Sequence, residues 1–148
     1  MIGVDTNILV YAHRADSEFH AAALRRLAEL AEGPATWAIP WPFLHEFLAI
    51  VTHPRIYAPP TPLARALDQL DAWLESPTLM LLAETTGHWT TLRSLLTDGR
   101  IAGPQVHDAR IAALCREHGV HELWSADRDF GRFTGLSVVN PLLAARSN

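Results

Sequence analysis

Two aspartates come directly after short apolar runs of the kind that form buried β-strands. Asp5 lies between the runs IGV and ILVYA, and Asp127 comes shortly after ELW in the stretch WSADRDF. In a parallel α/β sheet the carboxyl ends of the strands line one edge, and ligands bind there. We therefore expect both carboxylates at the same edge of one sheet.

Two further acids lie on apolar faces of predicted helices. Glu46 shares its face with Phe43 and Ile50, which predicts that this face is buried. Asp108 is followed along its own face by three apolar side chains: Ile111, Ala112 and Cys115. Both acids fall within about two turns of a helix start. Because the helices of such a fold run back from the carboxyl edge of the sheet, acids near their starts should approach Asp5 and Asp127.

Carboxylates that converge away from water need partners, since each costs several kcal/mol to desolvate. A hard divalent cation would neutralise the four and prefers oxygen ligands, so the pattern favours Mg²⁺ or Mn²⁺. Each acid alone also has an ordinary interpretation: a helix cap before Thr6 for Asp5, an ion pair with Arg55 for Glu46, one with Arg110 for Asp108, and a turn for ADRD. The four together favour a metal site.

The order of the predicted elements indicates an α/β fold. Strands are expected at 2–4, 36–39, 79–84, 121–126 and 136–141, and helical segments at 6–33, 40–53, 63–75, 87–99 and 103–119. The proline-rich residues 54–62 cannot be helical. In the helix at 63–75, one apolar stripe consists of Leu63, Leu67, Leu70 and Leu74. Strands that alternate with helices predict a mostly parallel sheet covered on both faces, in a single domain over residues 1–148.

The composition excludes several functions. All 12 basic residues are arginines, so a Walker A phosphate loop is absent, and response-regulator receivers, which also rely on a lysine, fit poorly. The net charge of −4 argues against bulk attraction to nucleic acid, so a polyanionic substrate would need a metal ion or local arginines. One cysteine, no secretory signal and no long apolar run predict a soluble cytoplasmic protein without membrane attachment.

The eight histidines do not form a convincing zinc site. His118 and His121 have the spacing HxxH, but no cysteine pair completes the ligand set, and His118 suits a helix C-terminus. His45 and His107 each precede one of the four acids, yet adjacent helical residues point about 100° apart. We leave both out of the predicted site.

The chain resembles the PIN-domain ribonucleases, in particular the VapC-type toxins of prokaryotic toxin–antitoxin modules. The resemblance covers essentially the whole chain and lies in four stretches: DTNILVYA at 5–12, PWPFLHEFLAIVTHPRI at 40–56, HDARIAALCREHG at 107–119 and SADRDFGRFTGLSVVNP at 125–141. It implies a three-layer α/β/α fold. It places Asp5, Glu46, Asp108 and Asp127 in the catalytic acidic quartet of that family. It also implies that the metal is bound by Asp5, Asp108, Asp127 and Asp129. Thr6 and Ser125 match hydroxyl positions that orient the first and last carboxylates.

The resemblance further implies a Mg²⁺- or Mn²⁺-dependent endoribonuclease that hydrolyses phosphodiester bonds in structured RNA, either transfer RNA or ribosomal RNA. A VapB-type antitoxin and a two-fold homodimer are the implied partners. Four arginines near the motifs could contact the RNA backbone: Arg14, Arg110, Arg128 and Arg132. The alternatives are a housekeeping PIN nuclease, a non-catalytic PIN-fold binding module, and a haloacid-dehalogenase-like phosphatase, whose second aspartate is replaced here by Asn7.

Overall fold

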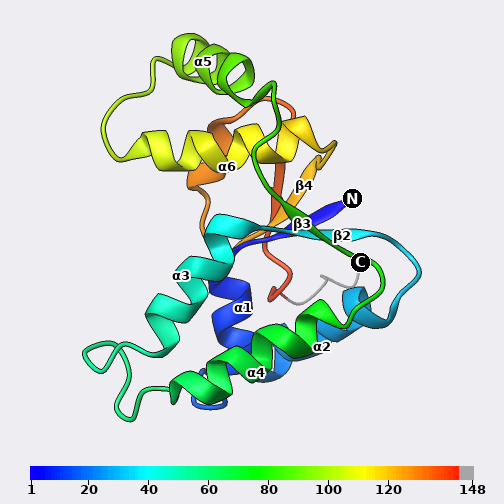
Figure 1. The fold of residues 1–148 in the computed structure, drawn as a ribbon, viewed down its shortest axis with the longest axis vertical. Coiled ribbons are helices and arrows are strands. Elements are labelled where there is room, and N and C mark those ends of the chain that lie inside the picture. Colours follow the sequence, from blue (N-terminus) through cyan, green and yellow to red (C-terminus); the bar gives the residue numbers. More distant parts are fainter. Residues whose placement is uncertain (144–148) are drawn as a thin grey trace.

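The computed structural model describes residues 1–143 and has a five-stranded parallel sheet at its centre (Figure 1). The last five residues of the predicted domain at 1–148 lie outside the described residues. The strands are β1 (Ile2–Val4), β2 (Trp37–Pro40), β3 (Leu79–Leu82), β4 (Glu122–Trp124) and β5 (Ser137–Val139). Their order in the sheet is β3-β2-β1-β4-β5, and every pairing is parallel. The predicted strands are confirmed: β1 has the predicted bounds, β2 is shifted by one residue, and the other three strands are shorter than predicted.

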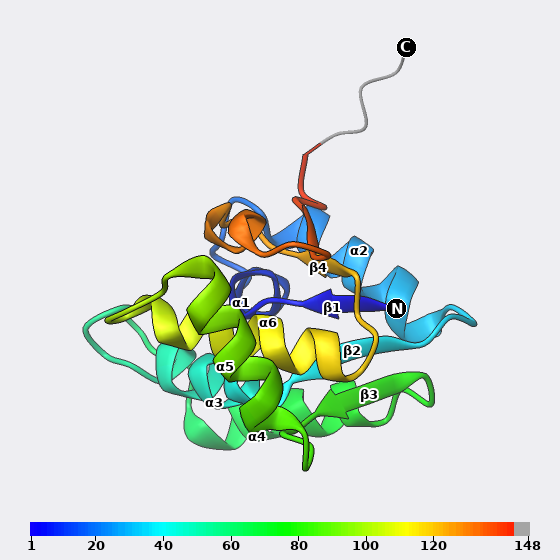
Figure 2. The same ribbon diagram turned by 90° about the horizontal axis from the view of Figure 1, so that it is seen from above.

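Helices cover both faces of this sheet and complete three layers. They are α1 (Thr6–His13), α2 (His20–Glu32), α3 (Trp41–Val51), α4 (Leu63–Leu74), α5 (His88–Gly99) and α6 (Gln105–Glu117), with a short 3-10 helix η1 (Asp129–Arg132). Figures 1 and 2 show α1 to α4 on one side of the sheet and α5 with α6 on the other. No helix within residues 1–143 has the length and apolar character needed to cross a membrane.

The chain reverses its direction across the sheet between β1 and β4. The first three strands follow one another outward from β1, and the chain then crosses over to place β4 on the other side of β1. Val4 pairs with Trp124 at the last position of these two strands, so Asp5 and Ser125 come next to each other at the carboxyl edge. The backbone N–H of Asp5 donates to the Trp124 carbonyl at 2.9 Å and continues the ladder by one bond. This is the switch point at which ligands bind in open α/β sheets.

The apolar stripe predicted on the helix at 63–75 does not face the core. Leu63, Leu67 and Leu74 are 61%, 44% and 43% exposed, whereas Ala66 and Trp73 are buried. The buried face is turned by one position along the helix because the Trp73 ring packs edge-on against Phe47 of α3, with ring centroids 4.9 Å apart. Three of the four leucines of the predicted stripe, Leu63, Leu67 and Leu74, therefore lie at the surface.

Arg14 fastens the end of α1 to the connection between α3 and α4. Its guanidinium donates to both oxygens of Asp16 at 2.9 and 2.6 Å, to the Pro59 carbonyl at 3.0 Å and to the Thr61 hydroxyl at 3.3 Å. It also lies over the Tyr57 ring, 4.1 Å from the ring centroid. Residues 54–62 are free of helix, as predicted, and Arg14 helps to hold them in place together with His13, whose Nε2 lies 3.1 Å from the Thr61 hydroxyl.

We predict that Arg14→Ala lowers the midpoint of thermal unfolding by about 3–6 °C, because it removes several charged hydrogen bonds at once. Arg14→Lys should recover only a small part of the loss, since an ammonium cannot reproduce the planar fork. Arg25 on α2 is exposed, so Arg25→Ala serves as the matched control for loss of one positive charge. Equal midpoints for the Arg14→Ala and Arg25→Ala variants would contradict this role.

Candidate functional site

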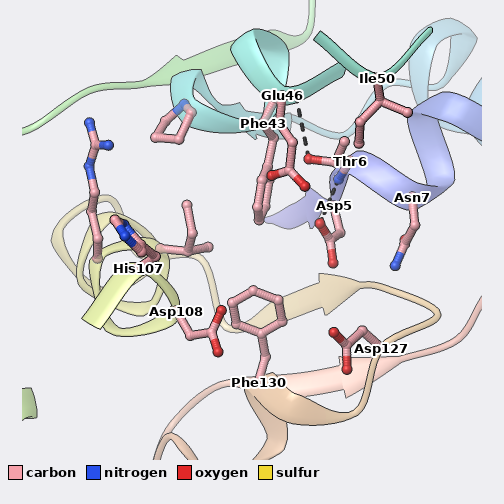
Figure 3. Close-up of a pocket in the computed structure, with 13 residues that line it drawn as sticks. Asp5, Thr6, Asn7, Phe43, Glu46, Ile50, His107, Asp108, Asp127 and Phe130 are labelled. Carbon is pink, nitrogen blue, oxygen red and sulfur yellow. Dashed lines mark hydrogen bonds between the residues drawn. The ribbon is translucent and has the colours of Figure 1, made fainter. Parts of the chain in front are cut away.

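A cavity of about 350 Å³ opens at the carboxyl edge of the sheet, and all four predicted acids line it (Figure 3). The acids come from segments far apart in the sequence: Asp5 from the end of β1, Glu46 from α3, Asp108 from the first turn of α6 and Asp127 from the connection after β4. The remaining lining residues are Thr6, Asn7, Pro42, Phe43, Ile50, His107, Arg110, Ile111 and Phe130. The convergence of the four acids predicted from strand ends and helix starts is thus present in the fold.

Asp5 is the acid that the fold buries, with 6% of its surface exposed. The backbone N–H of Thr6 donates to Asp5 Oδ1 at 2.6 Å, so Asp5 also caps the N-terminus of α1. The Ser125 hydroxyl donates to the other oxygen, Oδ2, at 2.6 Å. Both carboxylate oxygens are fixed in this way. Asp5 therefore caps a helix and lines the cavity at the same time.

Ser125 joins the first acid to the last. While its hydroxyl donates to Asp5, its oxygen accepts the backbone N–H of Asp127 at 2.9 Å and the side-chain amide of Asn7 at 3.3 Å. The Asn7 carbonyl oxygen in turn accepts the backbone N–H of Ala126 at 3.3 Å. The Ser125 hydroxyl thus orients the first carboxylate, Asp5, and contacts the backbone of Asp127 instead of its carboxylate. Asn7 is a supporting residue that sequence reasoning missed. The available signal was an amide in an otherwise apolar run, two residues after Asp5.

The hydroxyl of Thr6 does not reach a carboxylate. It donates to the Phe43 carbonyl at 3.4 Å and so links α1 to α3, while only its backbone N–H holds Asp5. The predicted orienting role of this hydroxyl therefore belongs to the backbone. Asp129 lies outside the cavity lining, and its backbone N–H donates to Asp127 Oδ1 at 2.9 Å. Asp129 is thus bonded to Asp127 through its backbone and does not line the cavity.

Glu46 and Asp127 are exposed, and Asp108 is half-buried. The prediction that the Glu46 face of its helix is buried is wrong for the acid itself. Phe43 is buried and Ile50 half-buried, as expected of that face, but the cavity opens between them and admits solvent to the carboxylate. Only Asp5 bears a large desolvation cost, and the other acids keep part of their hydration.

Burial and neighbouring charge disfavour the ionised form of two of the acids, Asp5 and Asp108. Burial raises the pKa of Asp5 from 3.8 to about 6 against the lowering effect of its hydrogen bonds to Ser125 and Thr6, and the charges of Glu46 and Asp127 raise it further. Burial also raises the pKa of Asp108, where Arg132 acts in the opposite direction and Asp129 and Asp127 add to the increase. The carboxylates are close enough to repel one another, as a cation site requires.

Among residues 1–143, no arginine or histidine forms an ion pair with any of the four acids. The ion pairs there join Arg14 with Asp16, Arg26 with Glu29, His88 with Glu117 and Arg110 with Glu84, so the pairings considered for Glu46 with Arg55 and Asp108 with Arg110 do not occur. In the same residues, no three acid, histidine or cysteine side chains are gathered closely enough to enclose a metal ion. An all-oxygen donor set around a solvent-filled cavity fits Mg²⁺, which keeps several of its waters and binds few carboxylates directly.

One histidine belongs to the cavity although sequence reasoning excluded it. His107 lines the cavity beside Asp108, because the first turn of α6 forms the rim and successive residues of that turn reach the opening. His45 does not line it and lies near Trp41, with ring centroids 6.0 Å apart. His118 makes a 2.8 Å contact from Nε2 to the Ala83 carbonyl, in keeping with a structural role.

Comparison with known proteins decides the family. The model of the PIN domain matches residues 2–136. The chain belongs to the PIN-domain family. Two relatives are the VapC ribonuclease Mb2897 of Mycobacterium bovis, 38% identical over 142 residues with 96% of each chain covered, and ribonuclease VapC48 of Mycobacterium tuberculosis, 31% identical over 137 residues with 93% of this chain and 94% of the relative covered.

Two solved structures share the PIN fold of this chain. VapBC2 from Rickettsia felis, bound to a DNA fragment from its promoter, superimposes with a TM-score of 0.68 at 22% identity, covering 94% of this chain and 98% of that one. A toxin–antitoxin complex from Klebsiella pneumoniae gives a TM-score of 0.59 at 19% identity, covering 95% and 98%. These likenesses confirm the three-layer PIN architecture expected from the sequence.

The raised pKa of Asp5 makes the stability of the metal-free PIN domain depend on pH. Asp5 binds its proton more tightly in the folded than in the unfolded chain. Its contribution to folding stability is therefore fully present below pH ~4 and is lost as the pH rises through about 6. The loss is on the order of 3 kcal/mol. Asp5→Asn removes this dependence. Measured in EDTA, the difference in unfolding free energy between the variant and the wild type should shift in favour of the variant between pH 4 and 7. A difference that is constant with pH would contradict the assignment.

Proposed function

We propose that this PIN domain is a metal-dependent endoribonuclease, a VapC-type toxin that hydrolyses phosphodiester bonds in structured RNA, either transfer RNA or ribosomal RNA. The observation that carries the proposal is the convergence of Asp5, Glu46, Asp108 and Asp127 on one cavity without a protein cation among the described residues to pair with them. The relatives named as VapC ribonucleases over nearly the whole chain support the same activity.

The acids of this chain have separable tasks in such a reaction. Asp5, Asp108 and Asp127 surround the part of the cavity where a cation would be held, with Asp129 supplying charge behind Asp127. When bound, Mg²⁺ or Mn²⁺ would lower the pKa of a water molecule and polarise the scissile phosphate. Glu46 is exposed on the α3 side of the cavity, near Asp5 and across from Asp108 and Asp127, and is free to orient water or accept a proton. Ser125 and the Thr6 N–H hold Asp5 in a fixed orientation throughout.

Single-stranded loops of a folded RNA suit this cavity better than a duplex. The net charge of −4 argues against bulk electrostatic attraction to the densely charged backbone of a double helix. Loops present unstacked nucleotides and an accessible backbone, and sequence-specific RNA recognition generally targets them. The cation would supply most of the attraction at the scissile phosphate, and few protein contacts would then suffice.

Purified protein incubated with total RNA should produce discrete fragments in Mg²⁺ or Mn²⁺ and none in EDTA. Hydrolysis should leave a 3′-hydroxyl and a 5′-phosphate, which end-sequencing of the fragments detects. Asp5→Asn should reduce cleavage by at least about 100-fold, the scale typical of an essential catalytic group, with the fold intact. Ca²⁺ should bind and support cleavage poorly because its coordination is looser. Undiminished cleavage in EDTA, or by the Asp5→Asn variant, would refute the mechanism.

A homodimer is the proposed assembly, and the exposed leucines of α4 support it. Leu63, Leu67 and Leu74 form an apolar stripe on a helix whose other side already packs against α3. Such a stripe marks an interaction surface in a small protein. Light scattering at micromolar concentration should give the mass of a dimer, and Leu67→Glu should give the mass of a monomer. Asp68→Ala, one position along the same helix, is the control and should remain dimeric.

A VapB-type antitoxin is the proposed inhibitor, because a ribonuclease acting on essential RNA would harm its own cell. We expect it to insert an arginine among the four carboxylates, since a guanidinium fork can bond two carboxylate oxygens at once. Expression of this protein alone should arrest growth, and co-expression of a small protein encoded next to it should restore growth. Normal growth with cleavage-competent protein present in the cell would favour a housekeeping PIN nuclease instead.

A further inference from the structure

Arg110 differs from the other three candidate RNA-contacting arginines because its side chain lines the acidic cavity. No other arginine among residues 1–143 belongs to that lining. Arg14 is occupied by Asp16 and the connection before α4, Arg128 lines a separate hollow, and the Arg132 Nε donates to the Asp129 carbonyl at 3.0 Å. Of the four candidate RNA-contacting arginines, the structure therefore singles out Arg110.

Glu84 holds the Arg110 guanidinium by one edge. Nε and Nη2 of Arg110 donate to the same oxygen, Oε1 of Glu84, at 2.9 and 2.6 Å, and this bonding lowers the pKa of Glu84. Nη1 makes no hydrogen bond to the protein within residues 1–143. One edge of the planar group is thus anchored, and donors remain for a ligand at the rim of the cavity.

The segment that carries Glu84 is itself fastened to α6 on both sides. The Ala83 carbonyl contacts His118 Nε2 at 2.8 Å, and the backbone N–H and hydroxyl of Thr85 donate to Glu117 Oε1 at 3.1 and 2.5 Å. Glu117 also contacts His88 Nδ1 through its second oxygen at 2.7 Å. Glu84 therefore extends from an anchored backbone, although its side chain is 40% exposed.

We propose that Arg110, positioned by Glu84, binds the RNA phosphate next to the scissile one. The proposal rests on the proposed endoribonuclease function. The scissile phosphate would lie among the four carboxylates, where a cation offsets their charge, but the flanking phosphates would meet an acidic cavity with little to attract them. Arg110 supplies the missing positive charge at the rim, two residues along α6 from Asp108. Its planar fork matches the non-bridging oxygens of a phosphate.

Binding and cleavage can be measured separately with one probe, a short fluorescein-labelled single-stranded RNA that contains the mapped cleavage sequence. In Ca²⁺, fluorescence anisotropy of the wild type and Arg110→Ala should show affinity weakened about tenfold or more by the variant. The negative slope of log affinity against log salt concentration should become shallower by about 0.7 in the variant, which is the share of one phosphate contact on a single strand. In Mg²⁺, KM should rise more than kcat falls.

Variants at Glu84 test its positioning role. Glu84→Ala should weaken RNA binding because Arg110 loses its anchor, whereas Glu84→Gln keeps an oxygen acceptor and should restore most of the affinity. Thermal unfolding should change little in all three variants, since an exposed ion pair contributes only about 0–1 kcal/mol. If the Arg110–Glu84 pair had a purely structural role, the variants would instead have a lower unfolding midpoint and an unchanged salt dependence of RNA binding.

Arg25→Ala on α2, far along the chain from the cavity motifs, is the control for net charge. If Arg110→Ala binds RNA with wild-type affinity and salt slope, or if Arg25→Ala weakens binding equally, the phosphate assignment is wrong while the nuclease function stands. If the wild type neither cleaves nor binds RNA, the proposed function fails and the assignment fails with it. Selective weakening by Arg110→Ala, with the lower slope, supports the assignment.

Discussion

The hydrogen bond from Ser125 to Asp5 ties together the two strand ends on which the whole site depends. Parallel pairing of β1 with β4 brings the two residues side by side at the switch point of the sheet, although 120 positions separate them in the sequence. Because the Ser125 oxygen also accepts the Asp127 N–H, one hydroxyl sets the relative position of the first and the last acid. Asn7 closes the same network from the first turn of α1. The geometry of the carboxylates is thus a consequence of strand order.

The fold concentrates the electrostatic cost of the site on one residue. Asp5 is buried and its pKa is raised to about 6, while Glu46 and Asp127 remain exposed and partly hydrated. Exposure limits the destabilisation caused by like charges and leaves the cavity open to a substrate. It also explains why a cation would be bound through few direct ligands and several waters, as Mg²⁺ prefers. The partly hydrated acids and the proposed metal chemistry are therefore consistent with each other.

Much of this arrangement could be predicted from the sequence because strands and helices have different periodicities. The sequence placed Asp5 and Asp127 at strand ends and Glu46 and Asp108 near helix starts. The topology of a parallel sheet then sufficed to predict that the four acids converge. Side-chain orientation could not be obtained in this way. The prediction that Glu46 is buried was wrong because a cavity interrupts the apolar face that periodicity assigns to the core.

The other differences also come from tertiary contacts that no local pattern encodes. The leucine stripe of α4 did not by itself indicate which side of the helix is buried, because the packing of Trp73 on Phe47 sets its rotation and leaves Leu63, Leu67 and Leu74 exposed. His107 was excluded by the angle between neighbouring helical residues, yet the first turn of α6 forms the cavity rim and exposes both His107 and Asp108 to it. The supporting amide of Asn7 became visible only once β4 was placed beside β1.

Titration calorimetry of Mn²⁺ into the metal-free protein tests the central claim, that the converging carboxylates form a cation site built on Asp5. The wild type should bind Mn²⁺ at both pH 6 and pH 7.5, with more protons released at pH 6, because Asp5 with a pKa of about 6 must lose its proton to bind the ion. Asp5→Asn should weaken binding by at least about tenfold, as expected for loss of a charged ligand. Absence of Mn²⁺ binding by the wild type at millimolar concentration, or equal binding by the Asp5→Asn variant, would contradict the account.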